Sequence, residues 1–266
     1  VISSADLVGR FEAHLSMEDW ASHKEAMAVL HKTKDAAFRE VGRLIRAGVP
    51  PREIEIAEFM RSIMREHHLH FEDGPIVGIN EHAGDPHFEP TEENSLTMKE
   101  GDILLLDLWG KMDRPGSIYA DITWMGYIGK SVPAALEEIF QVIRRGRDAA
   151  VALVRERFAA GVTVYGWEVD DACRKVIVDA GYGAFFTHRT GHNIGEEVHG
   201  NGVHIDNLET KDERTIIPGS CFSVEPGIYM PEKKLGFRTE IDVVVTDEGE
   251  VTVEGGLQER IVPILA

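Results

Sequence analysis

The stretch that decides the fold is VLHKTKDAAFREVGRLIRAGV at residues 29–49, because a related stretch, VIRRGRDAAVALVRERFAAGV, occupies residues 142–162. The two align without a gap at a shift of 113 residues (142 − 29). They share Val29, Asp35, Ala36, Ala37, Val41 and Ala47-Gly48-Val49. The period is too long for a solenoid, whose units span about 20–50 residues. The sequence therefore predicts a domain built from two copies of one unit.

Each copy has the pattern of helices followed by strands. Amphipathic periodicity and the glycine after each long run predict helices over residues 19–47 and 133–159, followed by helices over 52–69 and 165–180. Apolar and β-branched content predicts strands in 75–80, 102–109, 118–128, 196–206, 221–230 and 236–247. We expect an α+β fold with helices outside the sheet and halves at about 19–130 and 131–266. Residues 1–18, which lack an initiator Met, are interpreted as a linker or the remnant of a missing N-terminal domain.

The composition excludes several classes of partner. A net charge of −18 argues against binding to nucleic acid or to an anionic membrane surface, because both require a basic footprint. The sequence has no apolar run near the roughly 18 residues of a membrane span and no secretory signal. Its two cysteines, Cys173 and Cys221, lie in a helical pattern and at a strand start. We expect both to be reduced core residues, which favours a cytoplasmic location.

Four carboxylates stand in or beside apolar, strand-like runs. Asp107 and Asp121 lie in DILLLDLWGKMDRPGSIYADITW, and Glu225 and Glu240 lie in CFSVEPGIYMPEKKLGFRTEIDVVVT. The 113-residue shift places the first pair at 220 and 234, within six residues of the second pair. A carboxylate in an apolar core costs several kcal/mol or more unless it is paired or binds a cation. With His192 in THRTGHNIGEEVH, this donor set predicts a hydrolase centre with two hard divalent ions.

The chain resembles the pita-bread metallopeptidases over about residues 19–262. This superfamily holds the methionine aminopeptidases, aminopeptidase P and the prolidases. Its ligands follow the order Asp, Asp, His, Glu, Glu, and here they match Asp107 in LLDLW, Asp121 in YADITW, His192 in GHNIG, Glu225 in SVEPG and Glu240 in RTEID. The resemblance implies a curved antiparallel sheet, with the two halves related by a pseudo-twofold axis.

Three segments resemble the proline-specific branch more than the methionine branch. They are IVGINEHAGDPHFEP with its Pro-His pair, EPGIY with the following Arg-x-Glu, and His188 four residues before His192. The resemblance implies that Glu225 is the general base, and that His199 or His87 holds the scissile carbonyl oxygen or the departing nitrogen. It also implies that the substrate-binding residues are His188 beside the proline ring, His199, and Arg238, which would buttress the acidic residues. Ile241 and the stretch VHGNGVHIDN depart from the usual pattern.

The resemblance implies hydrolysis of the bond between an N-terminal residue and proline, as in Xaa-Pro dipeptidase or aminopeptidase P. The expected cofactors are two divalent ions (Mn, Co or Zn), the expected substrate is a small peptide, and the expected assembly is a homodimer. Alternatives are a methionine aminopeptidase, a non-catalytic pita-bread module that binds peptides, and a creatinase-like carbon–nitrogen hydrolase. Relatives of the last two kinds tend to lack the complete ligand set, which this chain retains.

Overall fold

Both halves of the chain begin with a pair of helices and continue with strands. The computed structural model describes residues 9, 11, 13–86 and 88–266. The first half contains α2 (Met17–Arg46), α3 (Glu53–Glu66), β1 (Leu69–His70), β2 (Ile76–Ile79), β3 (Ile103–Met112) and β4 (Ala120–Tyr127). The second contains α4 (Ala134–Ala159), α5 (Gly166–Asp179), β5 (Cys221–Val224), β6 (Gly227–Met230), β7 (Leu235–Arg238), β8 (Ile241–Val245), β9 (Val251–Glu254) and β10 (Val262–Pro263).

The helices begin and end where the local sequence directs. The Ser16 hydroxyl accepts the backbone N–H of Asp19 at 3.2 Å, and the Asp19 carboxylate accepts that of Ser16 at 2.8 Å, which forms a capping box before α2. Beyond the last turn, Gly48 adopts φ +73°. The left-handed conformation suits glycine and closes the helix. Its counterpart after α4, Gly161, has φ +64°.

The second helix of each half shows the repeat directly. A shift of 113 residues carries the bounds of α3, 53 and 66, onto those of α5, 166 and 179. Glu55 accepts the backbone N–H of Arg52 at 2.7 Å, and Glu168 accepts that of Tyr165 at 3.1 Å. The two glutamates are equivalent under the same shift, so the matching helices are capped in the same way.

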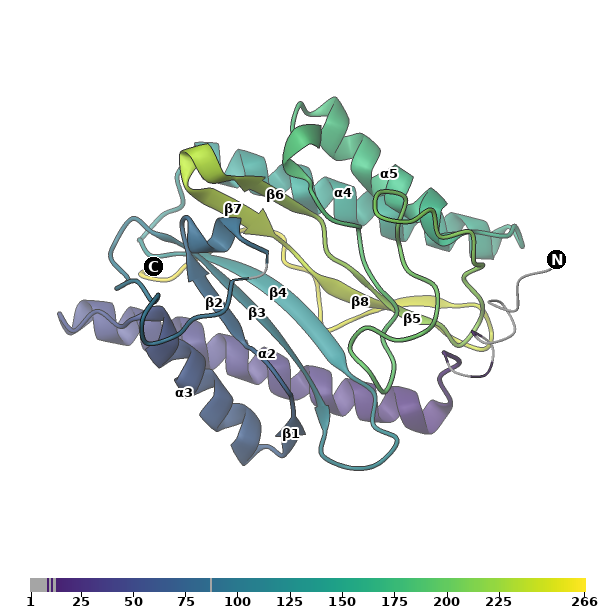
Figure 1. The fold of residues 1–266 in the computed structure, drawn as a ribbon, viewed down its shortest axis with the longest axis horizontal. Coiled ribbons are helices and arrows are strands. Elements are labelled where there is room, and N and C mark those ends of the chain that lie inside the picture. The colour runs from purple at the N-terminus through teal and green to yellow at the C-terminus, as the bar shows by residue number, and fades with distance from the viewer. Residues whose placement is uncertain (1–8, 10, 12, 87) are drawn as a thin grey trace.

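The strands lie between two pairs of helices (Figure 1). In that view α2 and α3 lie below the strands, and α4 and α5 lie above them. The largest sheet has the order β1-β3-β4-β10, with β2 also paired to β3; β5-β8-β9 and β6-β7 form the other ladders. The β3–β4 pair is antiparallel and the β4–β10 pair is parallel. The expected α+β class with helices outside the strands is confirmed.

Each pair of helices covers its own apolar core. One buried cluster joins α2 and α3 to β2, β3 and β4, and it includes Leu30, Val41, Met60, Leu104 and Leu106. The other joins α4 and α5 to the strands of the second half and to one face of β2, β3 and β4, and it includes Phe140, Ile143, Cys173, Phe222 and Phe237. Both cysteines are buried and free, as expected. No helix within the described ranges has both the length and the apolar character that a membrane span requires.

The predicted strand at 196–206 is wrong. In the structure this segment is irregular, and it pairs only through an isolated bridge between Gly191 and Ile205. Side chains replace the ladder: the Asn193 amide oxygen accepts the Gly202 N–H at 2.9 Å, and Asp212 accepts the His204 N–H at 2.7 Å. With these polar groups satisfied by side chains, the backbone needs no strand partner.

The predicted strands at 221–230 and 236–247 are each divided in two. The first is interrupted at Glu225-Pro226, between β5 and β6, and the second at Thr239-Glu240, between β7 and β8. Pro226 has no N–H to donate to a ladder. Each break therefore falls at a predicted metal ligand, so Glu225 and Glu240 both lie outside the regular strands.

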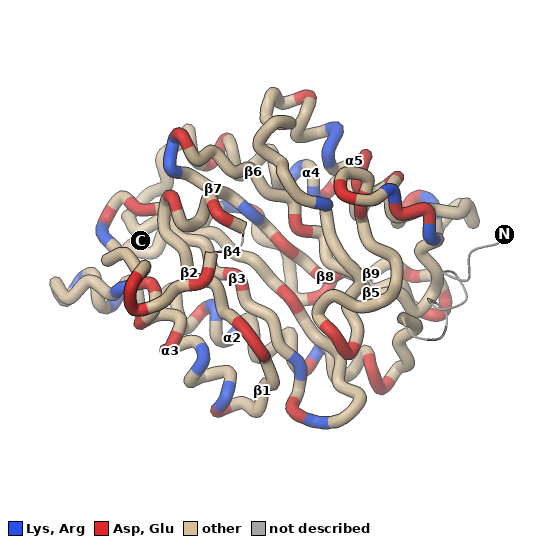
Figure 2. The backbone as a smooth tube through the Cα atoms, viewed as in Figure 1, with Lys and Arg blue, Asp and Glu red and all other residues tan. Residues whose placement is uncertain are grey.

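The two halves meet where β4 lies beside β8. The Asp121 N–H donates to the Asp242 carboxylate at 2.9 Å, and the Glu240 N–H donates to the Thr123 carbonyl at 3.2 Å. Figure 2 shows acidic positions on β3, β4 and β8 in the middle of the molecule. This junction brings the carboxylates of one half against those of the other.

Candidate metal centre

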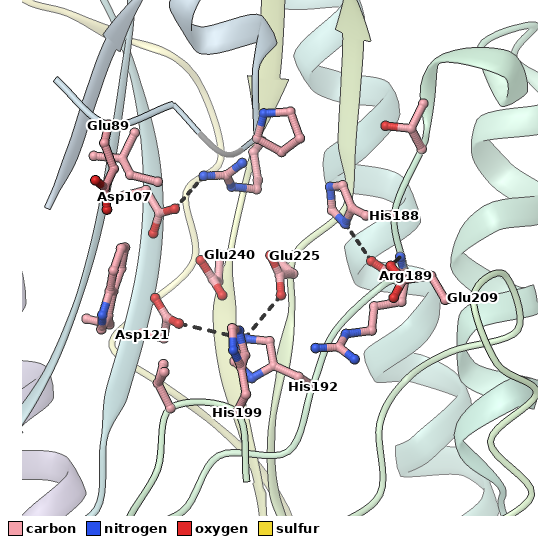
Figure 3. A pocket seen from close by; sticks show the side chains of 16 residues that line it. Glu89, Asp107, Asp121, His188, Arg189, His192, His199, Glu209, Glu225 and Glu240 are labelled. Carbon is pink, nitrogen blue, oxygen red and sulfur yellow. Dashed lines mark hydrogen bonds and ion pairs between the residues drawn. The ribbon is translucent and has the colours of Figure 1, made fainter. Parts of the chain in front are cut away.

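The five predicted ligands lie on the wall of one cavity of about 590 Å³ (Figure 3). Asp107 comes from β3 and Asp121 from β4, whereas the other three come from the second half of the chain. The cavity is lined by Ile76, Pro86, Glu89, Asp107, Trp109, Asp121, Thr187, His188, Arg189, His192, Val198, His199, Glu209, Glu225, Arg238 and Glu240. Residues more than 100 positions apart therefore share one site.

Three of the five form a tight cluster. Asp121, His192 and Glu240 each offer one ligand atom, and these atoms lie within 4.8 Å of one another. All three side chains are buried. The Nε2 atom of His192 lies 3.8 Å from Asp121 Oδ2 and 3.3 Å from Glu225 Oε1. Within the described part of the chain, Oδ1 of Asp121 has no hydrogen-bond partner, although it is buried. Such a group is expected to face a cation.

The backbone fixes the orientation of His192. Its N–H donates to the Ser223 hydroxyl at 3.0 Å, and its Nδ1 atom lies 3.2 Å from the Asn193 carbonyl oxygen. A carbonyl can only accept, so Nδ1 carries the proton and Nε2 turns its lone pair toward the acids. The preceding Gly191 has no room for a side chain, since a Cβ there would lie 2.0 Å from the Ser223 oxygen. Burial, and then the neighbouring His199, hold the pKa of His192 well below its usual value, which keeps the ring neutral.

Burial raises the pKa of every carboxylate in the centre. For Asp121 and Glu240 the increase is large, because each also faces other carboxylates. Burial raises the pKa of Asp107 less, since Arg238 opposes it. Burial also raises the pKa of Glu225, to about 7. Four acids crowded in this way are costly as anions, and divalent cations would remove the cost. With a neutral imidazole among them, the donor set fits hard or borderline divalent ions.

Arg238 lies on the wall of the same cavity and contacts the acids directly. Its guanidinium forms a short ion pair with the Asp107 carboxylate, and it donates to the Tyr229 hydroxyl at 3.1 Å and the Thr123 hydroxyl at 3.2 Å. Thr123 in turn donates to the Glu240 carboxylate at 2.7 Å. The arginine is buried, and its contacts connect the carboxylates of both halves.

The predicted substrate histidines have different surroundings. His188 lines the cavity; its Nδ1 donates to the Arg189 carbonyl at 2.6 Å, and its Nε2 lies 2.8 Å from the Tyr229 hydroxyl. Burial raises the pKa of Tyr229 to about 12, so its hydroxyl stays protonated and donates to that nitrogen. The His199 ring packs edge-on against His192 with centroids 4.3 Å apart. His87 lies outside the described residues.

Several site residues were not predicted from the sequence. Thr123, Ser223 and Asp242 form hydrogen bonds with predicted ligands, Tyr229 accepts one from Arg238, and Glu89, Arg189 and Glu209 line the cavity. Tyr229 lies in the segment EPGIYM, in which the sequence predicts a role only for the first residue, Glu225. Asp242 lies in β8, whereas Glu240 lies in the break before that strand. An acid inside the apolar run IDVVV was the available signal for Asp242.

The fold and the donor set define the class of protein as the pita-bread metallopeptidases. Residues 25–247 match the model of metallopeptidase family M24, and the chain belongs to this family. The match covers most of both helix pairs and all five predicted ligands. The confirmed resemblance therefore extends over most of the chain.

Individual relatives agree with this assignment. The chain is 35% identical over 187 residues to the probable dipeptidase PepE of Mycobacterium tuberculosis, covering 70% of this chain and 45% of that protein. It is 32% identical over 216 residues to the Xaa-Pro dipeptidase of Lactobacillus helveticus, covering 81% and 54%. The crystal structure of dipeptidase PepE from Mycobacterium ulcerans is similar with a TM-score of 0.79 and 26% identity, covering 99% of this chain and 64% of that one. The chain spans about half the length of the curated relatives it matches.

Proposed function

We propose that this protein hydrolyses the peptide bond between an N-terminal residue and proline, using two divalent ions held by Asp107, Asp121, His192, Glu225 and Glu240. The observation that carries the proposal is the convergence of these five side chains on one cavity, with burial raising the pKa of all four carboxylates. The ions would be manganese, cobalt or zinc. When bound, they lower the pKa of water and polarise the scissile carbonyl.

Glu225 is the proposed general base. Its pKa of about 7 is near the value at which a carboxylate both accepts and releases a proton efficiently at neutral pH. The Ser223 hydroxyl lies 3.1 Å from Glu225 Oε1 and orients the carboxylate. In this role Glu225 takes the proton of the attacking water and passes it to the proline nitrogen. His199 or His87 would donate a hydrogen bond to the carbonyl oxygen or the departing nitrogen.

The substrate side of the cavity suits a short zwitterionic peptide. His188, held by Tyr229 and the Arg189 carbonyl, would contact the proline ring. The Arg189 guanidinium lines the cavity, and among the described residues it forms no ion pair or side-chain hydrogen bond. Figure 3 places Arg189 and Glu89 on opposite sides of the carboxylate cluster. A guanidinium at one end matches a free carboxylate, and an acid at the other matches an amine.

The similarity to an Xaa-Pro dipeptidase at 32% identity supports the proposed bond specificity. From the family resemblance we also propose that the active form is a homodimer. A cytoplasmic location is also part of the proposal, supported by the two free, buried cysteines.

The test has two parts. Metal-free protein is reconstituted with Mn²⁺ or Co²⁺, and bound metal is counted per chain; two equivalents are expected, and fewer than one would contradict the two-ion centre. Xaa-Pro dipeptides are then assayed beside Xaa-Pro-Yaa and Met-Ala-Yaa peptides. Cleavage of Met-Ala-Yaa alone would identify a methionine aminopeptidase instead. Metal binding without hydrolysis of any of these peptides would favour a peptide-binding module.

A further inference from the structure

A buried acid–imidazole pair lies directly behind the candidate metal centre, and the proposed mechanism does not use it. Asp242 on β8 and His23 on α2 both have 0% exposure. The Nε2 atom of His23 lies 3.6 Å from Asp242 Oδ2. Burying a carboxylate and an imidazole together costs free energy unless hydrogen bonds satisfy both groups, so the presence of this pair calls for an explanation. Any task in metal binding depends on the metal centre of the proposed function.

Asp242 contacts the main chain of a predicted ligand. Its Oδ2 atom accepts the backbone N–H of Asp121 at 2.9 Å. Asp121 pairs with Trp109 of β3 on one side, so its other edge faces β8. The contact therefore fixes the Asp121 backbone against the strand that begins directly after Glu240. These two predicted ligands come from different halves of the chain, and the Asp242 contact joins their segments alongside the bond from the Glu240 N–H to the Thr123 carbonyl.

Ser223 makes the equivalent contact to a second ligand. It lies directly opposite Asp242 in the β5–β8 ladder. Its hydroxyl accepts the backbone N–H of His192 at 3.0 Å. Two neighbouring polar side chains on adjacent strands thus each hold the main chain of one member of the Asp121–His192–Glu240 cluster. Because the same kind of contact occurs twice, it indicates that Asp242 and Ser223 support the ligands together and that Asp242 is not an isolated buried acid.

His23 holds the same strand segment from the helix side. Its Nδ1 donates to the Tyr119 carbonyl at 2.6 Å, two residues before Asp121. Its unprotonated Nε2 then faces the Asp242 carboxylate at 3.6 Å, which is beyond hydrogen-bond distance. Within the described part of the chain, neither His23 Nε2 nor Asp242 Oδ1 has a hydrogen-bond partner. His23 therefore contacts the Asp121 segment twice, once through Tyr119 and once through Asp242.

We propose that Asp242 is a positioning residue that holds the Asp121 backbone in place for metal binding, and that His23 on α2 holds Asp242. Through this pair, an outer helix of the first half sets the ligand geometry at the junction of the halves. The essential property of residue 242 is a fixed hydrogen-bond acceptor for the Asp121 N–H. Charge is not required for that role.

Two variants separate the acceptor from the charge. D242N keeps an oxygen that can accept the Asp121 N–H and gains an amide that can donate to His23, whereas D242L has a similar size and no acceptor. We expect D242L to bind Co²⁺ about 10- to 100-fold more weakly, as is typical when a group that supports a ligand is lost. D242N should bind within a few-fold of wild type. The readouts are the Co²⁺ dissociation constant and the visible absorption of the bound ion, which reports its geometry.

A matched control is D102L. Asp102 is also a buried acid that accepts a backbone N–H, that of Lys99 at 2.9 Å, but it does not line the cavity. D102L should lower the melting temperature and leave Co²⁺ affinity and absorption unchanged. H23L should weaken Co²⁺ binding in the same direction as D242L. Unchanged affinity in H23L would overturn the role given to His23.

The outcomes are distinguishable from failure of the proposed function. If wild-type protein binds Co²⁺ and D242L binds it equally well, the positioning role is wrong and the metal centre stands. If D242N loses as much affinity as D242L, the charge and not the acceptor is what matters, and the role as stated is also wrong. If wild-type protein binds no Co²⁺, the metal centre fails, and this role fails with it.

Discussion

The predicted metal ligand Glu225 has a pKa near neutrality, so its replacement is expected to separate proton transfer from metal binding. E225Q keeps an oxygen that can face a cation but cannot accept a proton at neutral pH. We expect kcat for an Xaa-Pro dipeptide to fall by about 10²- to 10⁴-fold, the usual contribution of a general base. Stopped assays at saturating metal measure this. The exposed Glu72 gives the control E72Q, whose kcat should match wild type, and an equally unaffected E225Q would remove Glu225 from the role.

Arg189 is the residue expected to distinguish a free carboxylate from an amide at the end of the substrate. A hydrogen bond to a charged group contributes about 1.5–3 kcal/mol, which is roughly 10- to 100-fold in affinity. R189Q should therefore raise KM for an Xaa-Pro dipeptide by about that factor and leave KM for the matching Xaa-Pro amide unchanged. The surface variant K211Q should change neither value. An equal rise for both substrates would point to a general disturbance of the cavity.

At the scale of elements, helix α2 carries a half-buried histidine, His31, with a consequence for acid stability. Burial, and then Lys34, lower the pKa of His31 from 6.5 to about 4. Because the folded value lies below the unfolded value, the unfolded chain binds more protons between them. The stability contributed by neutral His31 is complete above pH 6.5 and is lost as the pH falls toward 4.

The variant H31Q tests this. It cannot titrate, so its melting temperature should fall less than that of wild type between about pH 7 and pH 4.5. The difference between the two proteins should vary across this interval and be constant above it. Calorimetry on both proteins in the same buffers measures it. A wild-type curve parallel to that of H31Q throughout would show that His31 is not protonated on unfolding.

The helices were predictable from the sequence because their signals are local. Amphipathic period, capping residues and the glycines at 48 and 161 placed α2 and α4 within three residues at each end. The segment 196–206 misled because Val198, Val203 and Ile205 suggest a strand. Its backbone groups are instead satisfied by Asn193 and Asp212, and neither partner is adjacent in the sequence.

The candidate site also contains some residues that could be predicted from the sequence and others that could not. Its five predicted ligands occur in short motifs that can be read one at a time, and the structure places all of them on one cavity. Arg189 and Asp242 were missed because their importance arises from partners. Arg189 matters because its guanidinium forms no ion pair among the described residues. Asp242 matters because its carboxylate accepts the N–H of Asp121, which lies 121 residues earlier. Neither relation exists until the halves pack together.

At the scale of the whole molecule, metal removal should change both stability and its dependence on pH. The raised pKa values of Asp121 and Glu240 mean that the metal-free folded state holds protons that the unfolded chain has released. The stability that these protonated carboxyl groups contribute is therefore fully present below the pKa of the unfolded carboxylates and declines as the pH rises. Bound cations stabilise the charged carboxylates and oppose this decline.

We therefore expect the chelator-treated protein to melt at a lower temperature than the metal-loaded protein, with a difference that grows from about pH 5 to pH 8. At a free metal concentration near 100 times Kd, the expected stabilisation is about 2.7 kcal/mol. Paired thermal scans with and without EDTA measure it. Identical scans at the upper end of this range would contradict a metal centre that joins the two halves.

The duplication also leaves the two halves unequal at one position. Each supplies an acidic pair, but a shift of 113 residues carries His192 back to Ile79, whose side chain offers no lone pair. If the centre holds two ions as proposed, the ion bound by the imidazole has a softer ligand than the other ion, so the two sites should differ in affinity and fill in order. Titration with metal should show two steps in place of one. Two identical half-sites would bind both ions with equal intrinsic affinity, so a single titration step would contradict this inequality.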